Sequence, residues 1–109
     1  MSPEALWSIE FVDNEEHHGG GIAVLQNKRI LGGNTSFTYV GDYHLEGGDI
    51  ICNAHIRRFN DVMPGIYKDD FHLSVRGRFD DLQFIATGAP LDDDSLLIAV
   101  QFTRQGEIV

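Results

Sequence analysis

The side chains best suited to metal binding or catalysis are five histidines and one cysteine. A zinc site needs three or four converging ligands, usually with a recognisable local spacing, and this sequence has no such spacing. His17 and His18 are adjacent, so in a strand they would point to opposite faces. The other three are scattered over predicted strands and are expected to point outward: His44, His55 and His72. Cys52 lies in an apolar stretch and is interpreted as an inert core thiol in a reducing compartment.

No catalytic motif accompanies these residues. The sequence lacks a Gly-x-Ser-x-Gly elbow, a P-loop and a His-Glu-x-x-His pair. The acidic run Asp92-Asp93-Asp94 could hold calcium weakly, but it lacks the glycine and terminal glutamate of an EF-hand loop. A solvated loop is the favoured interpretation. We therefore expect a protein that is not an enzyme, uses no cofactor and no metal, and works by binding.

The chain is strongly acidic, with 17 Asp and Glu residues against 8 Lys and Arg and a net charge of -9. Nucleic-acid binding needs the opposite balance, so direct binding to DNA or RNA is not expected. The same field repels anionic membrane surfaces, while a basic protein partner is compatible with it. Residues 1–11 contain no basic residue and no apolar signal region, which favours a cytoplasmic protein.

Half of the basic side chains lie on two segments that are expected to be neighbours. They are Arg57, Arg58, Arg76 and Arg78. This cluster could bind an anion or an acidic partner, but cross-strand pairing with carboxylates is the favoured explanation.

These residues must be positioned by strands, because apolar and polar residues alternate with a period of two along most of the chain. Clear alternating segments include Trp7, Phe37 and Phe71 on their apolar faces. About eight short strands with a turn signal roughly every ten residues are typical of a β-sandwich or a β-barrel. Consecutive short connections favour an eight-stranded antiparallel up-and-down β-barrel, formed by residues 1–109 as a single domain.

The turns support the same fold. Asn27-Lys28 predicts a tight hairpin turn, because asparagine tolerates the positive φ that such turns need. Gly47-Gly48 predicts another, and Gly19-Gly20-Gly21 is interpreted as a glycine-rich turn beside the paired histidines. Residues 60–70 contain Pro64-Gly65 and form the one irregular stretch, with at most one short helical turn.

The order of the glycine and aromatic segments is more specific than a general β pattern. The segments are Leu6-Trp7-Ser8-Ile9-Glu10-Phe11, Gly19-Gly20-Gly21-Ile22-Ala23-Val24-Leu25, Arg29-Ile30-Leu31-Gly32-Gly33-Asn34 and Phe37-Thr38-Tyr39-Val40-Gly41-Asp42-Tyr43. Through them the whole chain resembles the GrlR-like family, whose founding member is a negative regulator of type III secretion. The resemblance implies a small bacterial barrel of the calycin or lipocalin type, which forms dimers. In the founding regulator an acidic loop is implicated in holding a transcription activator, and the matching turn here, Glu46-Gly47-Gly48-Asp49, keeps two of its four acids.

Two functions stay open from the sequence. The first is a regulatory protein that sequesters a protein partner, such as a transcription regulator, through acidic loops at Glu46, Gly47, Gly48 and Asp49 or at residues 92–94. The alternative is a carrier that holds a small apolar ligand inside the barrel against four aromatic side chains: Trp7, Phe37, Tyr39 and Phe71. A homodimer is expected from the resemblance and from apolar residues on the outward parity: Val40, Ile51, Ile85 and Leu97.

Overall fold

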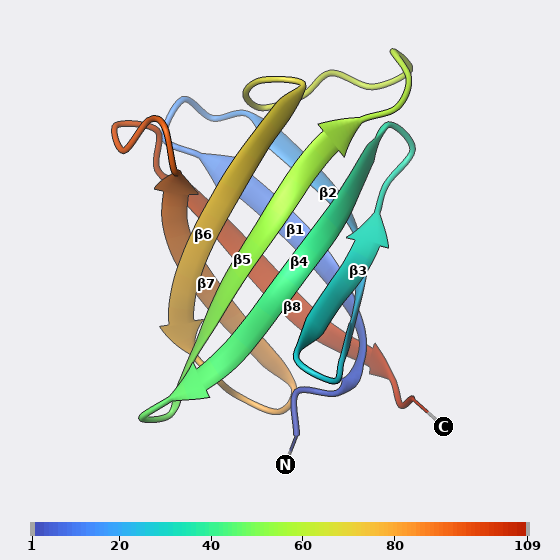
Figure 1. The fold of residues 1–109 in the computed structure, drawn as a ribbon, viewed down its shortest axis with the longest axis vertical. Coiled ribbons are helices and arrows are strands. Elements are labelled where there is room, and N and C mark those ends of the chain that lie inside the picture. Colours follow the sequence, from blue (N-terminus) through green and yellow to red (C-terminus); the bar gives the residue numbers. More distant parts are fainter. Residues whose placement is uncertain (1, 109) are drawn as a thin grey trace.

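Eight antiparallel strands form a closed barrel in the computed structural model, which describes residues 2–108 (Figure 1). The strands are β1 (Ala5–Asp13), β2 (His18–Gln26), β3 (Arg29–Gly33), β4 (Phe37–Glu46), β5 (Asp49–Arg58), β6 (Asp70–Arg78), β7 (Gln83–Pro90) and β8 (Ile98–Gly106). Each strand pairs with the next in sequence, and β8 pairs with β1 to close the ring. The predicted up-and-down antiparallel barrel is therefore confirmed.

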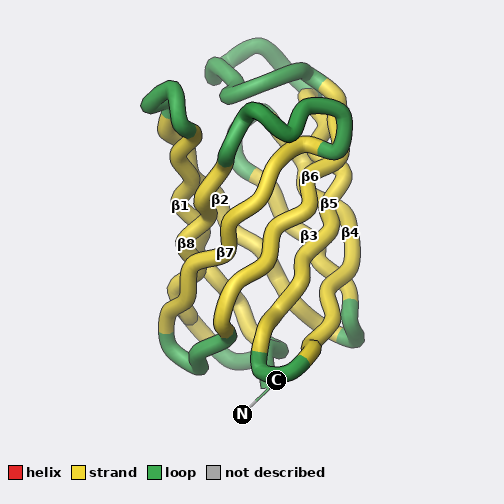
Figure 2. Tube along the Cα trace, turned by 90° about the vertical axis from the view of Figure 1, so that its left-hand side faces the viewer, coloured by secondary structure: helices red, strands yellow, loops and turns green. Residues whose placement is uncertain are grey.

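The barrel has two different ends, which we call the base and the mouth. The base holds the start of β1, the end of β8 and three short connections, at residues 27–28, 47–48 and 79–82. The mouth holds the connections at residues 14–17, 34–36, 59–69 and 91–97 (Figure 2). The four mouth connections include the two longest ones, so this end carries most of the irregular structure.

Two of the base turns were predicted from sequence and are confirmed. Asn27 and Lys28 both have positive φ, at 53° and 63°, as a two-residue hairpin of the right-handed twist requires. Gly47 and Gly48 have φ of 60° and 89° and connect β4 to β5 in the same way. These turns set the register of both hairpins, and the registers place alternate side chains inside the barrel.

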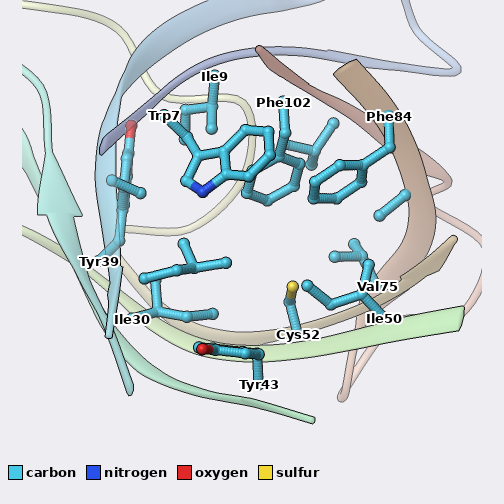
Figure 3. Packing of buried hydrophobic residues seen from close by; sticks show 14 of the residues in the cluster. Trp7, Ile9, Ile30, Tyr39, Tyr43, Ile50, Cys52, Val75, Phe84 and Phe102 are labelled. Atoms are coloured by element: carbon cyan, nitrogen blue, oxygen red, sulfur yellow. The ribbon is translucent and has the colours of Figure 1, made fainter. Parts of the chain in front are cut away.

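The base is filled by aromatic side chains around Trp7, which is completely buried. The ring centroids of Phe84 and Phe102 lie 5.1 and 6.3 Å from that of Trp7, both edge-on (Figure 3). The Phe79 ring centroid also lies 6.3 Å from that of Trp7, again edge-on. The Arg104 guanidinium lies 4.8 Å from the Trp7 ring centroid. The indole N–H of Trp7 donates to the carbonyl of Pro3 at 2.8 Å, so the chain before β1 also covers this end. The base is closed and packed.

The glycines at 19–21 correct one prediction, because they lie inside β2 and form no turn. Their missing side chains make room for aromatic rings on the neighbouring wall. A Cβ at Gly19 would stand 2.4 Å from the Phe11 ring, and a Cβ at Gly21 would stand 2.9 Å from the Tyr39 hydroxyl oxygen. A glycine inside a strand therefore marks a close approach here.

The irregular stretch after β5 contains bends and no helical turn, and helices are absent from the whole of residues 2–108. No helix in that range is long and apolar enough to cross a membrane.

Candidate functional site

An apolar cavity of about 120 Å³ lies inside the barrel, between the aromatic base and the mouth. Its walls are inward side chains of the strands, among them Ile9, Ile30 and Val75. Its roof is the connection between β5 and β6, from Met63 to Ile66. No Asp, Glu, Lys or Arg side chain lines it. The cavity can therefore accept an apolar molecule, while a charged one would lose its hydration without compensation.

Three of the four aromatic residues predicted to contact an interior ligand line this cavity: Phe37, Tyr39 and Phe71. The prediction fails for Trp7, because this side chain lies in the filled base and is not part of the cavity wall. Alternation places a side chain on the inward face, but it does not tell how far along the barrel axis the side chain lies. That level depends on the register of all eight strands.

The polar groups at the cavity are few and come from the mouth end. They are His18, Asn34 and Tyr39. Tyr39 is 5% exposed, and its hydroxyl oxygen accepts a hydrogen bond from Asn34 Nδ2 at 3.0 Å. Burial raises the pKa of Tyr39 to about 12, so the hydroxyl keeps its proton at physiological pH.

Asn34 is held by four hydrogen bonds, and these fix the position of Tyr39. Its Nδ2 also donates to the Gly20 carbonyl at 2.9 Å, and its Oδ1 accepts from the backbone N–H groups of Ser36 and Phe37, each at 2.9 Å. The turn between β3 and β4 thus connects to β2 through one amide side chain.

The roof is held down by a second polar group, formed by Ser36, Arg58 and Asn60. Ser36 is completely buried; its Oγ donates to Asn60 Oδ1 at 2.6 Å and accepts from the Met63 backbone N–H at 2.8 Å. Arg58 Nη1 donates to the carbonyls of Asn60 and Met63 at 2.9 and 2.7 Å. The Arg58 guanidinium also lies 4.5 Å from the Phe37 ring centroid, so the same side chain joins the roof to the cavity wall.

Sequence reasoning missed the roof residues and Asn34. Asn34 directly follows Gly32-Gly33, and nothing in its local sequence points to a role at a binding site. Met63, Ile66 and Pro64 are apolar or turn residues inside an irregular stretch, and such an apolar cluster in a loop was the available signal that the loop covers a core. Their partners are distant in sequence, so no local pattern names them.

The predicted acidic partner site lies at the base, far from the cavity. In this hairpin Asp49 accepts from Arg76 Nε at 2.9 Å, and a Glu46 carboxylate oxygen lies 3.9 Å from Arg76 Nη2. Gly47 and Gly48 form the turn itself. The second acidic loop lies at the mouth, where Asp92 pairs with Lys68 at 2.7 Å. The two acidic loops therefore lie at opposite ends of the barrel (Figure 1).

The arginine cluster pairs with carboxylates, as the favoured explanation predicted. The nearest nitrogen–oxygen contacts are Arg57 with Asp70 at 3.8 Å, Arg58 with Asp69 at 2.7 Å, Arg76 with Asp49 at 2.9 Å and Arg78 with Asp49 at 3.9 Å. Because most of these side chains are exposed, each such pair contributes little to stability.

The histidines are less scattered than expected, because His55 and His72 face each other across β5 and β6 on the outer surface. Their rings stack with centroids 4.3 Å apart, and His55 Nε2 lies 2.6 Å from Asp70 Oδ1. The hydrogen bond and charge of His55 hold the pKa of Asp70 below its usual range.

A second group of acidic and histidine side chains lies at the end of β1 and in the β1–β2 connection: Asp13, Glu15 and His17, close enough in space for one ion. The buried Asp13 carboxylate already accepts from the backbone N–H groups of Glu15 and His17 and contacts His17 Nδ1, each at 2.9 Å. These contacts stabilise the turn between β1 and β2, and this structural role explains why the three side chains lie close together.

Cys52 lies on the cavity wall as an inward core residue. Burial and the nearby Asp42 charge raise the pKa of its thiol to about 12. It therefore stays a neutral thiol, which fits the predicted inert role.

Of the four apolar residues predicted to face outward, Val40, Ile85 and Leu97 are exposed, but the four do not lie side by side. Val40 pairs with His55 and Ile51 pairs with His44, while Ile85 lies on β7 and Leu97 precedes β8, so these four form no common patch. A different set is contiguous, because Leu6 pairs with Val24, Val24 with Leu31 and Leu31 with Val40. We call these four residues the apolar row.

Comparison with known proteins supports the fold alone. No family model matches the chain, and no curated protein matches it. A solved structure described as a redesigned beta barrel is similar, with a TM-score of 0.51, 11% sequence identity, and coverage of 94% of this chain and 90% of that one. The class defined by fold and site is thus a closed eight-stranded β-barrel with an apolar interior cavity.

Proposed function

We propose that the protein binds a small apolar molecule in the cavity beneath residues 63–66. The observation that carries this proposal is the cavity itself: about 120 Å³ of space with no charged side chain on its wall. Well-packed cores leave few voids larger than a water molecule, and a void this large lowers stability. An empty apolar cavity of roughly 150 Å³ in another protein stays dry and binds benzene.

The size of the cavity limits the ligand. Drug-sized ligands occupy pockets of roughly 300–1,000 Å³, so this site suits a molecule of about one ring. Such a ligand would replace missing dispersion contacts with Phe37, Phe71 and Val75.

The proposal is tested by isothermal titration calorimetry with toluene, on the wild-type protein and two variants. Ala54→Leu adds three carbons to the cavity wall and should abolish binding. Ala89→Leu makes the same change on the outer face, where Ala89 pairs with Ser74, and should bind as the wild type does. A wild-type protein that takes up no toluene, or equal binding by both variants, would exclude the cavity as the site.

Sequestration of a protein partner through Glu46, Gly47, Gly48 and Asp49 stays a prediction. A basic partner would have to compete with Arg76 for both carboxylates, so its binding would be strongly salt-dependent. The same applies to the resemblance to the GrlR-like family, the cytoplasmic location and the absence of enzymatic activity: each is a prediction for experiment.

A further inference from the structure

The hydroxyl group of Tyr39 is a buried hydrogen-bond donor without an acceptor in the protein. Its oxygen accepts from Asn34 Nδ2, and within residues 2–108 the structure shows no hydrogen bond in which the Tyr39 hydroxyl donates. A buried donor left unsatisfied costs stability, so the position favours an occupant that supplies the missing acceptor.

The neighbouring polar groups cannot take that place. Both amide hydrogens of Asn34 are used, toward Gly20 and Tyr39, and its oxygen already accepts two backbone N–H groups. His18, the remaining polar residue of the wall, is exposed to solvent at the mouth. Apart from the weak S–H donor of Cys52, Tyr39 is therefore the side chain deep in the described wall that still has a donor to offer.

A water molecule is a poor occupant of this position. Buried waters make about three hydrogen bonds, whereas a water beside Tyr39 would find this hydroxyl and at most the nearby Gly33 carbonyl oxygen. An acceptor atom carried by an apolar molecule needs one donor only.

We propose that the ligand is a neutral molecule of about one ring that carries a single hydrogen-bond acceptor, such as a ketone, aldehyde or ester oxygen, and that this oxygen accepts from the Tyr39 hydroxyl. This inference rests on the proposed function and specifies the chemistry of its site. The absence of charged wall residues excludes carboxylates and ammonium groups, and the cavity volume sets the size. Tyr39 would then select the ketone over a hydrocarbon of equal shape.

The test uses acetophenone and its hydrocarbon isostere α-methylstyrene, titrated by calorimetry into wild type and Tyr39→Phe. Taking the ratio of the two dissociation constants within each protein, and comparing the ratios, cancels the different water solubilities of the probes. We expect the ratio to shift by about tenfold against the ketone in Tyr39→Phe, because the ketone oxygen then loses the hydroxyl donor. Tyr43→Phe, at a tyrosine that lies outside the cavity wall, should leave the ratio at the wild-type value.

The outcomes separate this inference from the function on which it rests. If neither probe binds a wild-type protein that takes up toluene, this inference is overturned and the cavity function stands; if toluene does not bind either, both are overturned. If both probes bind and the ratio is the same in Tyr39→Phe, the cavity function stands and the role of Tyr39 is overturned. Should Tyr39→Phe fail to fold, the infrared carbonyl stretch of acetophenone bound to the wild type decides: a shift to lower frequency than in hexane supports the hydrogen bond, and an unshifted band overturns it.

Discussion

Gly21 shows how one missing side chain shapes the site. A Cβ at this position would lie 2.6 Å from the Gly33 carbonyl oxygen and 2.9 Å from the Tyr39 hydroxyl oxygen. Because a backbone carbonyl cannot move aside easily, Gly21→Ala should destabilise the fold by about 1–3 kcal/mol. Urea unfolding followed by circular dichroism measures this. Gly106→Ala is the control, since an added Cβ there meets nothing within 4 Å, and equal losses in both variants would contradict the crowding argument.

The contact between His17 and Asp13 predicts a pH dependence. The hydrogen bond from His17 and its charge interaction with Asp13 raise the pKa of His17 above its usual value of 6.5. For Asp13, burial raises the pKa, but the backbone N–H and ring of His17 and the N–H of Glu15 outweigh it and lower the pKa below 3.8. The stabilisation from protonated His17 is thus complete below about pH 6.5 and is lost as pH rises through the raised pKa. The Asp13 contribution is present above pH 3.8 and is lost as pH falls through the lowered value.

We therefore expect His17→Gln to lower the unfolding free energy more at pH 5.5 than at pH 8.5. Chemical denaturation at both values measures the difference, with His18→Gln, at the first residue of β2, controlling for loss of a neighbouring imidazole. If the unfolding free energies of wild type and His17→Gln differed by the same amount at both pH values, a stabilising contact between protonated His17 and Asp13 would be contradicted.

At the scale of elements, the roof depends on Ser36. Its Oγ is the acceptor for the Met63 N–H and a donor to Asn60, and the side chain is completely buried. Ser36→Ala leaves the half-buried Met63 N–H without its acceptor, whereas Asn60 Oδ1 still accepts from the Val62 N–H; we expect a cost of about 1–3 kcal/mol. We expect faster amide hydrogen exchange at Met63 and faster ligand association, because the roof opens more often.

Ser95→Ala is the matched control for the roof. Its Oγ donates to Asp93 at 2.6 Å in the neighbouring mouth connection, but the contact is exposed and local. Exchange at Met63 should match the wild type in this variant. Unchanged exchange in Ser36→Ala would mean that Arg58 alone holds the roof.

The elements also show which features a sequence can predict. The alternation of apolar and polar residues predicted the strands and their inward faces, because the side of a strand on which a residue lies depends only on its position along that strand. The Asn27-Lys28 turn followed from the local backbone preference of asparagine. The sequence analysis placed Gly19 to Gly21 in a turn because glycines are common in turns. In the structure they lie in a strand, and side chains at Gly19 and Gly21 would collide with Phe11 of β1 and Tyr39 of β4. Likewise, the roof is fixed by Ser36, which precedes Met63 by 27 residues.

At the scale of the whole molecule, a net charge of -9 makes copies of the protein repel one another. The apolar row is free of charge and runs over four neighbouring strands, with Leu31 at 51% and Val40 at 43% exposure. An uncharged, contiguous face is where two such molecules can approach with least repulsion. If the predicted homodimer forms, this face is the expected contact, and salt should strengthen the association by screening the remaining charges.

Light scattering on the wild type, Leu31→Lys and Ile85→Lys at equal concentration tests this expectation. Leu31→Lys places a charge inside the apolar row and should yield monomers. Ile85 is 55% exposed but pairs with Gln101 on β8, away from the row, so Ile85→Lys should keep the wild-type mass. A monomeric wild type would refute the dimer itself, whereas a dimeric Leu31→Lys would move the contact to another face. Because both substitutions add the same charge to surfaces of similar exposure, any difference between them reports position on the barrel and not net charge.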